Sequence, residues 1–209
     1  MLQFSSMNRS FAALLALTLC ILPITSLLAQ TEQQKKTMAV LNKASERLMQ
    51  GDITALDDVK ALPGDDAVAG LISFFQSNFY VFSKETKKKA IATKAALYIT
   101  ECPTAADYIR RLFRKEAGRP KSGLLARYRE ATLDALASAK NPFAINLLFE
   151  LMDDPQLEVP QGDISVALAK MDLPGAPFTS KARQGAATPE GIARWQPWWE
   201  ANKATYQKP

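Results

Sequence analysis

The residue types that carry most enzymatic chemistry are missing from this chain or badly placed in it. Its 209 residues include no histidine, which excludes His-ligated metals, Ser-His-Asp and Cys-His sites, and the commonest general base near neutral pH. The clearest carboxylate groups are the adjacent pairs Asp65-Asp66 and Asp153-Asp154. Adjacent side chains diverge on a helix, so neither pair converges on one substrate atom. We therefore predict no catalytic residues, no metal, no cofactor and no enzyme activity.

The first 29 residues have the composition of an export signal. Arg9 is their only charge, and residues 11–28 form an apolar run with few polar interruptions. Ala29 is the predicted cleavage point, although Leu27 stands where a small residue is preferred. We predict a periplasmic or secreted protein. The alternative is a retained membrane anchor, because a run of about 18–20 apolar residues can just span a bilayer.

Cleavage would leave a mature chain of mild charge with one cysteine. Removing residues 1–29 removes Arg9 and no acid, so 25 basic residues remain against 21 acidic ones, a net charge of +4. Such a charge does not by itself indicate nucleic acid, and export removes that target. Cys20 leaves with the signal, so Cys102 has no disulfide partner. We interpret Cys102 as a small structural residue.

Helical periodicity runs through almost the whole mature chain, and alternating strand patterns are missing. We predict helices over residues 31–50, 53–62, 65–82, 85–100, 103–117, 122–139, 143–152, 162–171 and 188–206. Asp52 is the expected N-cap of the second helix, and Pro103 is expected to begin the fifth. Asn141-Pro142 supplies an N-cap and first residue, as Thr188-Pro189 does for the last helix. Pro197 is expected to kink or split that last helix.

One sequence frame, Ala-Leu followed by five residues and a proline, occurs three times. The copies run from Ala96-Leu97 to Pro103, from Ala135-Leu136 to Pro142, and from Ala167-Leu168 to Pro174. The copies are offset by 39 and then by 32 residues. The alanine permits close helix approach, and the proline is expected to start the partner helix. Because one helix pair cannot cover its own apolar stripe, we predict pairs stacked into a short α-solenoid.

This pattern resembles the HEAT-repeat family of α-solenoids. Residues 129–137, Arg-Glu-Ala-Thr-Leu-Asp-Ala-Leu-Ala, with Pro142 through Asp153-Asp154-Pro155, are similar to its repeat unit. Residues 192–203, Ile-Ala-Arg-Trp-Gln-Pro-Trp-Trp-Glu-Ala-Asn-Lys, look like the tryptophan-rich ending of exported bacterial HEAT-like proteins. The resemblance covers roughly residues 52–206. It implies an all-α fold: a signal peptide at 1–29, a repeat domain at 30–175, and a loop with a capping helix at 176–209. A longer-period or non-repeating bundle is the alternative, given the short second offset.

The resemblance also implies a function class. Solenoids usually act through an extended concave surface, so we expect a non-catalytic protein–protein interaction module, or scaffold, whose partner is an unidentified protein. An anionic surface or polymer is the second hypothesis for the partner. An enzyme of unknown class is the third hypothesis, because a fold does not exclude activity. Membrane contact is otherwise expected only if the N-terminal segment is retained, and nucleic acid is not expected.

The second hypothesis rests on a basic stretch with seven net positive charges in 20 residues. Its members are Arg110, Arg111, Arg114, Lys115, Arg119, Lys121, Arg127 and Arg129, interrupted only by Glu116. Such a cluster can hold an acidic protein, a phospholipid surface or a polyanion. The alternative is an ordinary solvated helix face with its loop.

Two aromatic groups have competing explanations. Leu71, Phe75, Phe79 and Phe82 form a core stripe at helical spacing, which leaves Phe74 and Tyr80 as candidate anchors in an inner groove. Trp195, Trp198 and Trp199 suggest either a carbohydrate site or a structural cap. The helical spacing of Ile192, Trp195 and Trp199 favours the cap.

Overall fold

The computed structural model describes residues 27–79, 86–114, 123–157 and 160–207, and all regular elements in these ranges are α-helices. They are α2 (Leu27–Met49), α3 (Ala55–Lys60), α4 (Asp65–Phe79), α5 (Thr86–Glu101), α6 (Ala105–Phe113), α7 (Gly123–Ala139), α8 (Pro142–Asp153), α9 (Gln161–Lys170), α10 (Pro189–Ala193) and α11 (Trp195–Tyr206). The expected all-α class is confirmed. The predicted signal segment lies outside the described residues up to position 26.

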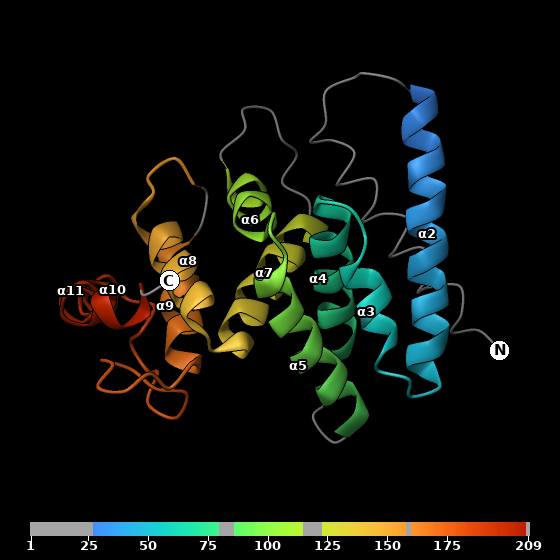
Figure 1. The fold of residues 1–209 in the computed structure, drawn as a ribbon. Coiled ribbons are helices and arrows are strands. Elements are labelled where there is room, and N and C mark those ends of the chain that lie inside the picture. Colours follow the sequence, from blue (N-terminus) through green and yellow to red (C-terminus); the bar gives the residue numbers. More distant parts are fainter. Residues whose placement is uncertain (1–26, 80–85, 115–122, 158–159, 208–209) are drawn as a thin grey trace.

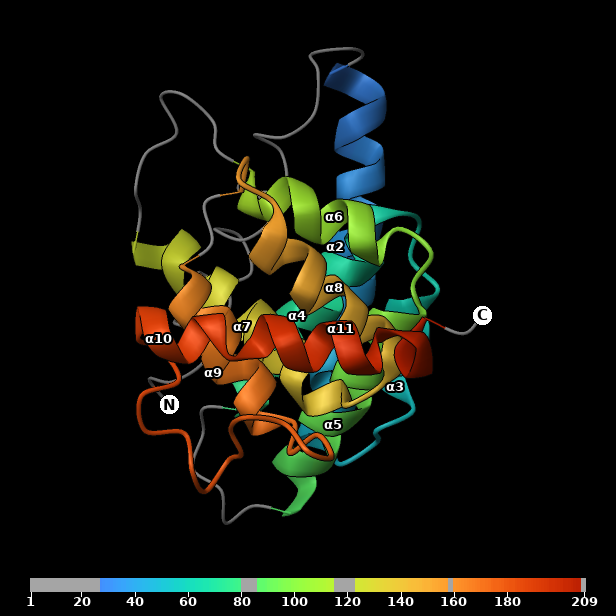
Figure 2. The same cartoon turned by 90° about the vertical axis from the view of Figure 1, so that its left-hand side faces the viewer.

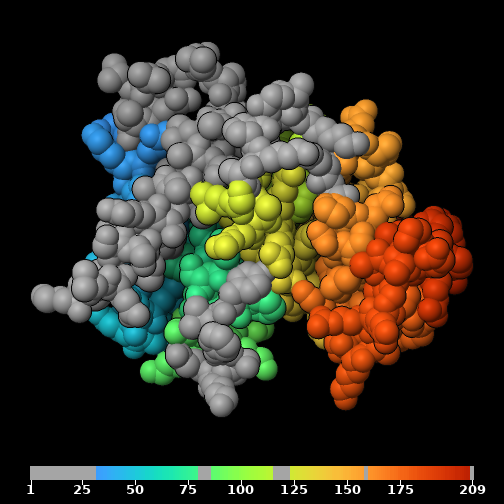
Figure 3. Space-filling model, turned by 180° about the vertical axis from the view of Figure 1, so that it is seen from behind, coloured from blue at the N-terminus to red at the C-terminus, as the bar shows by residue number. Residues whose placement is uncertain are grey.

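The helices follow one another across the molecule in chain order (Figure 1), from α2 at one side to α10 and α11 at the other. Alternate helices touch: α3 packs against α5, α5 against α7, and α7 against α9. Sequential partners also pack, most extensively α4 with α5. From behind, the described residues form successive colour bands on the surface (Figure 3). The apolar core is therefore shared between packed helix pairs.

The alanine of the repeated frame is buried at every copy. Relative exposure is 0% for Ala96 and Ala135 and 2% for Ala167. A fourth Ala-Leu pair, Ala55-Leu56, occupies the same place in α3. It does not fit the sequence frame, because six residues instead of five separate Leu56 from Pro63. Ala55 and Leu56 are both fully buried. Leu97 is the exception among the leucines, at 39% exposed.

An alternating row of charges joins the C-terminal ends of α3, α5, α7 and α9. We call it the charge row; each member lies four residues after the leucine of its Ala-Leu pair, and its members are Lys60, Glu101, Lys140 and Asp172. Lys60 pairs with Glu101, and Lys140 Nζ lies 3.4 Å from Asp172 Oδ2. Asn141 Nδ2 donates to Thr100 Oγ1 at 2.7 Å, joining the middle of the row. Equivalent positions of successive helices therefore meet.

The backbone supports the same equivalence at the last two members of the charge row. Lys140 has φ 49° and Asp172 has φ 54°, so both end their helices in the left-handed region. Ser180, in the loop after α9, binds the last member of the charge row. Its backbone N–H and its hydroxyl both donate to Asp172, at 2.8 and 3.0 Å. These bonds and Lys140 lower the pKa of the Asp172 carboxyl.

The prolines of the frame do not share one role, contrary to expectation. Pro142 begins α8, and Asn141 Oδ1 caps it by accepting from Ala144 N–H at 3.0 Å. Pro103 instead lies in a turn before α6. Pro174 is followed by Gly175 at φ 67° and by loop. A second proline at 177 keeps the chain there from forming a helix.

Two predicted helix limits are also corrected. Asp52 does not cap α3; its Oδ1 accepts from Thr54 N–H at 3.0 Å, and Thr54 is the residue that precedes the helix. Arg47 Nε donates to Asp52 at 2.8 Å and fixes this turn to α2. The predicted helix over 103–117 already ends at Phe113, because Arg114 takes extended backbone angles and bridges to Leu157.

Different helices cover the two ends of the row of helices. At one end α2 buries Leu41, Ala44 and Leu48 and packs on α3. At the other end α11 crosses in front of α8 and α9 (Figure 2). The predicted split of the last helix is confirmed, since α10 and α11 meet at Arg194. Pro197 is the third residue of α11, where a helix does not use the backbone N–H.

Candidate functional site

Two arginines of the basic stretch form ion pairs with acidic residues of the fold. Arg110 donates to Asp107 at 2.9 Å and to Glu150 on α8 at 2.5 Å. Arg111 donates to Asp65 on α4 at 2.6 Å. These two arginines therefore join helices of the fold, and their charge is compensated where they stand.

The other members of the stretch are dispersed. Arg129 Nε donates to the Leu112 carbonyl at 2.9 Å, and its guanidinium lies 5.6 Å from the Phe113 ring centre. Arg114 and Arg127 are exposed. Lys115, Arg119 and Lys121 lie outside the described residues. Of the eight basic residues, Arg114 and Arg127 are the exposed ones in the described part of the chain, and Arg110, Arg111 and Arg129 are half-buried.

One of the two predicted aromatic anchors, Phe74, is placed differently from the expectation. Phe74 is buried, with 3% of its surface exposed, so it does not line an open groove. Phe79, predicted to be core, is 41% exposed and stacks on Phe75 at 4.7 Å. The reason is that α4 is contacted by α3, α5, α6 and α7, so more than one face of it is buried before it ends at Phe79. Tyr80 and Phe82 lie outside the described residues.

The three tryptophans are buried around Phe149 of α8. Ring centres of Trp195, Trp198 and Trp199 lie 6.2, 6.0 and 4.2 Å from that of Phe149. Trp195 Nε1 donates to Ser165 Oγ at 2.7 Å, and Trp198 Nε1 donates to the Pro174 carbonyl at 3.2 Å. The aromatic cluster therefore holds α11 to α8, α9 and the loop after α9.

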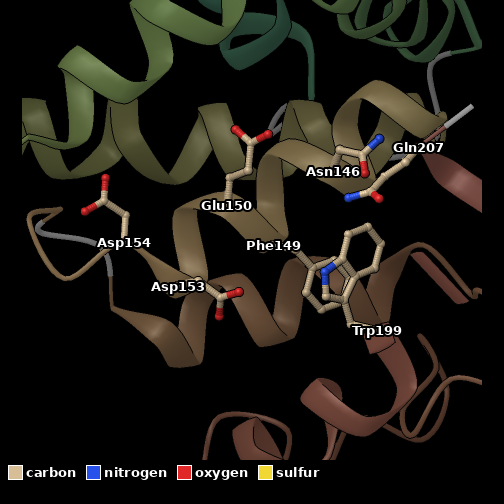
Figure 4. A pocket seen from close by; sticks show the side chains of 7 residues that line it. All are labelled: Asn146, Phe149, Glu150, Asp153, Asp154, Trp199 and Gln207. Atoms are coloured by element: carbon tan, nitrogen blue, oxygen red, sulfur yellow. The ribbon is translucent and has the colours of Figure 1, made fainter. Parts of the chain in front are cut away.

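A shallow pocket of about 360 Å³ opens beside this cluster, between α8 and the C-terminal end of α11 (Figure 4). We call it the α8–α11 pocket; its lining residues are Asn146, Phe149, Glu150, Asp153, Asp154, Trp199 and Gln207. Three of these are acids, and none is basic. The Phe149 and Trp199 rings are stacked, with their planes 10° apart. The pocket wall is therefore acidic, and its two aromatic rings are largely buried against each other.

The acidic residues of this pocket lie at the C-terminal end of α8, where negative charge is unfavourable. Glu150, Asp153 and the C-cap Asp154 occupy the end of α8, and its last turn has no basic residue. The carbonyl end of a helix carries partial negative charge, so acids there are destabilising. Partial burial of the carboxyl and the nearby Glu200 both raise the pKa of Asp153, even though the residue as a whole is exposed. The ionised Asp153 therefore opposes folding above that raised pKa.

A buried acceptor adds to the pocket wall. Asn146 Nδ2 donates to the Tyr206 carbonyl at 2.7 Å, which fixes the orientation of the amide. Its Oδ1 is buried and accepts no hydrogen bond within the described part of the chain. A buried acceptor without a donor costs about 1–3 kcal/mol. The pocket therefore holds both excess negative charge and an unsatisfied acceptor.

The remaining buried polar groups have structural explanations. Tyr108 and Tyr128 share a hydrogen bond of 3.0 Å between their hydroxyls, and burial raises the pKa of Tyr108 to about 12. Burial also raises the pKa of the Cys102 thiol, which opposes the thiolate that a nucleophile needs. Among the described residues, His, Cys, Asp and Glu side chains do not gather in threes that could hold a metal ion.

None of the described helices combines the length and the apolar character needed to cross a bilayer. No family model, curated protein or solved structure matches the chain.

Proposed function

We propose that the chain is an exported helical-repeat protein that binds another protein without catalysing a reaction. In this proposal residues 30–175 are a short HEAT-like α-solenoid, and residues 176–209 close it. The observation that carries the proposal is the charge row of Lys60, Glu101, Lys140 and Asp172. Side-by-side stacking of repeats brings equivalent positions of successive helices together in this way.

The covered ends support the same proposal. Repeat arrays need terminal units with a polar outer face to stay soluble. The helices α2 and α11 lie at the two ends, and most of their exposed residues are polar. The sides of the stack are then the surface left for a partner. The hypothesis of an anionic surface is the second proposal, and the ion pairs of Arg110 and Arg111 compensate two of the eight basic residues on which it rests.

Affinity capture with the chain beginning at Gln30 tests this proposal. We expect one periplasmic or secreted protein to be retained at both 0.15 and 0.5 M salt and to be displaced by free chain, because contacts within a packed interface are little screened. Binding to anionic vesicles that disappears at the higher salt would favour the second hypothesis. N-terminal sequencing of the exported protein should begin near Gln30, and a retained Met1 would contradict cleavage.

A further inference from the structure

Two segments that are far apart in the sequence carry basic residues at the same end of the molecule. Figures 1 and 2 show the first turn of α5 and the loop between α9 and α10 at the lower end of the view. The α5 turn carries Lys87 and Lys89, and the loop carries Lys181 and Arg183. All four are exposed, and none forms an ion pair within the described part of the chain. The fold therefore leaves the positive charge of this end uncompensated.

The lysines of α5 lie where a helix disfavours positive charge. The N-terminal end of a helix carries partial positive charge, and the first turn of α5 contains no acid. A Cβ atom at Gly51 would lie 3.4 Å from Lys87 Nζ, so this lysine lies beside the turn that follows α2. Residues that break a local rule without a compensating contact are expected at functional sites.

The loop after α9 holds its two basic residues in a fixed turn. Ser180 donates twice to Asp172 at the end of α9, and Ala182 N–H donates to Thr179 Oγ1 at 3.1 Å. Residues 173–189 include no acid. The loop is therefore a basic projection whose backbone is tied to the end of a core helix.

Two exposed apolar residues lie near the α5 turn. Met49 is the last residue of α2, at the lower end of that helix in Figure 1, and is 56% exposed. Phe79 is the last residue of α4, which packs on α5, and is 41% exposed. Apolar side chains beside lysine or arginine are typical of a surface that lies in the interface of a membrane. We call this surface the α5–loop surface; its members are Met49, Phe79, Lys87, Lys89, Lys181 and Arg183.

We propose that the α5–loop surface docks the protein on an anionic phospholipid bilayer. Its four basic side chains lie at the level of the lipid phosphates, and Met49 and Phe79 enter the headgroup boundary. An extended, flat partner touches both basic segments at once, which a small anion does not. The two apolar residues favour a bilayer over a soluble polyanion, which has no apolar interior. This inference goes beyond the proposed function and does not depend on a protein partner.

Co-sedimentation of the chain beginning at Gln30 with lipid vesicles tests the inference. At about 0.15 M salt we expect binding to phosphatidylcholine vesicles that contain about one-third phosphatidylglycerol, and binding at least about tenfold weaker to phosphatidylcholine alone. The double variants Lys87→Gln, Lys89→Gln and Lys181→Gln, Arg183→Gln should each weaken the binding about tenfold or more. The reason is that each basic residue at an anionic membrane surface contributes a factor of about five in affinity.

The double variant Arg114→Gln, Arg127→Gln is the matched control. It removes the same charge from two exposed residues of the basic stretch. Arg114 follows α6, which lies at the upper end of the molecule in Figure 1. The control should therefore weaken vesicle binding less than about threefold, because charges remote from the membrane are screened.

Both test variants change exposed residues, and the α5 pair removes charges that oppose the helix, so Tm should be unchanged or raised. Loss of vesicle binding at an unchanged Tm assigns these residues to the bilayer. Equal binding to both kinds of vesicle, or an equal loss in all three double variants, would overturn the inference. A loss confined to the control would assign the contact to the basic stretch instead, and a loss in one test variant alone would contradict joint docking. Binding to soluble polyphosphate without binding to vesicles would also overturn it.

Discussion

Trp195→Ala is expected to lower the free energy of unfolding by about 3–5 kcal/mol, the usual cost of removing a buried aromatic side chain. Trp195 is fully buried, and it contacts Phe149 and Phe178. Its indole N–H donates to Ser165 Oγ, which in turn donates to the Ala186 carbonyl at 2.5 Å. The substitution therefore leaves a cavity and removes the donor to Ser165, which loosens the covering of α8 and α9.

Thermal and denaturant unfolding measure this effect. For a chain of this size, the loss corresponds to a fall in Tm of roughly 6–20 °C. Trp195→Phe keeps much of the ring and loses only the hydrogen bond, so its loss should be about 1–3 kcal/mol. Gln196→Ala, next in the chain and exposed, should stay within about 0.5 kcal/mol of the unchanged protein. Equal stability of Trp195→Ala and Gln196→Ala would contradict the buried position of the indole.

Gly191→Ala is the second substitution with a large expected effect. A Cβ atom at Gly191 would lie 2.0 Å from the Gly185 carbonyl oxygen and 3.0 Å from that of Ala186. Both obstacles are backbone, so either α10 or the loop before it must move. Overpacking of this kind costs about 1–3 kcal/mol. We expect that loss, with the largest increase in amide hydrogen exchange over residues 185–195.

Gly123→Ala is the matched control for this substitution. Gly123 begins α7, and a Cβ atom there meets no atom of the described residues within 4 Å. Alanine also favours a helix over glycine, so Gly123→Ala should leave stability unchanged or raise it by up to about 1 kcal/mol. A loss in Gly123→Ala as large as that in Gly191→Ala would mean that crowding is not the cause.

The sequence was informative where the physics is local. Asn141 and Thr188 were identified as N-caps because capping needs only the residue itself and the backbone N–H three residues later. A split of the last helix was predicted from Pro197; α10 and α11 meet at Arg194, which leaves Pro197 in the first turn of α11, where the helix does not use the backbone N–H. The burial of the frame alanines agrees with the close helix approach that a small residue permits. Each of these signals lies within a few residues of its effect.

The candidate site was missed because its parts come from separate helices. Asp153 and Trp199 lie on α8 and on α11, and no spacing rule joins them. The available signal was three acids at the C-terminal end of one helix, a position that favours bases. The ion pairs of Arg110 and Arg111 could not be predicted for the same reason: Glu150 and Asp65, which compensate them, are 40 and 46 residues away in the chain.

The central claim is that successive helix pairs stack with equivalent positions in contact. Zero-length carbodiimide cross-linking of the mature chain tests it, because this reagent joins an amine only to a carboxylate that touches it. Mass spectrometry should find two links from the charge row, Lys60 to Glu101 and Lys140 to Asp172, and should not find Lys60 to Asp172. If the folded, monomeric chain gives neither adjacent link, or joins Lys60 to Asp172 instead, the helices do not stack in this order.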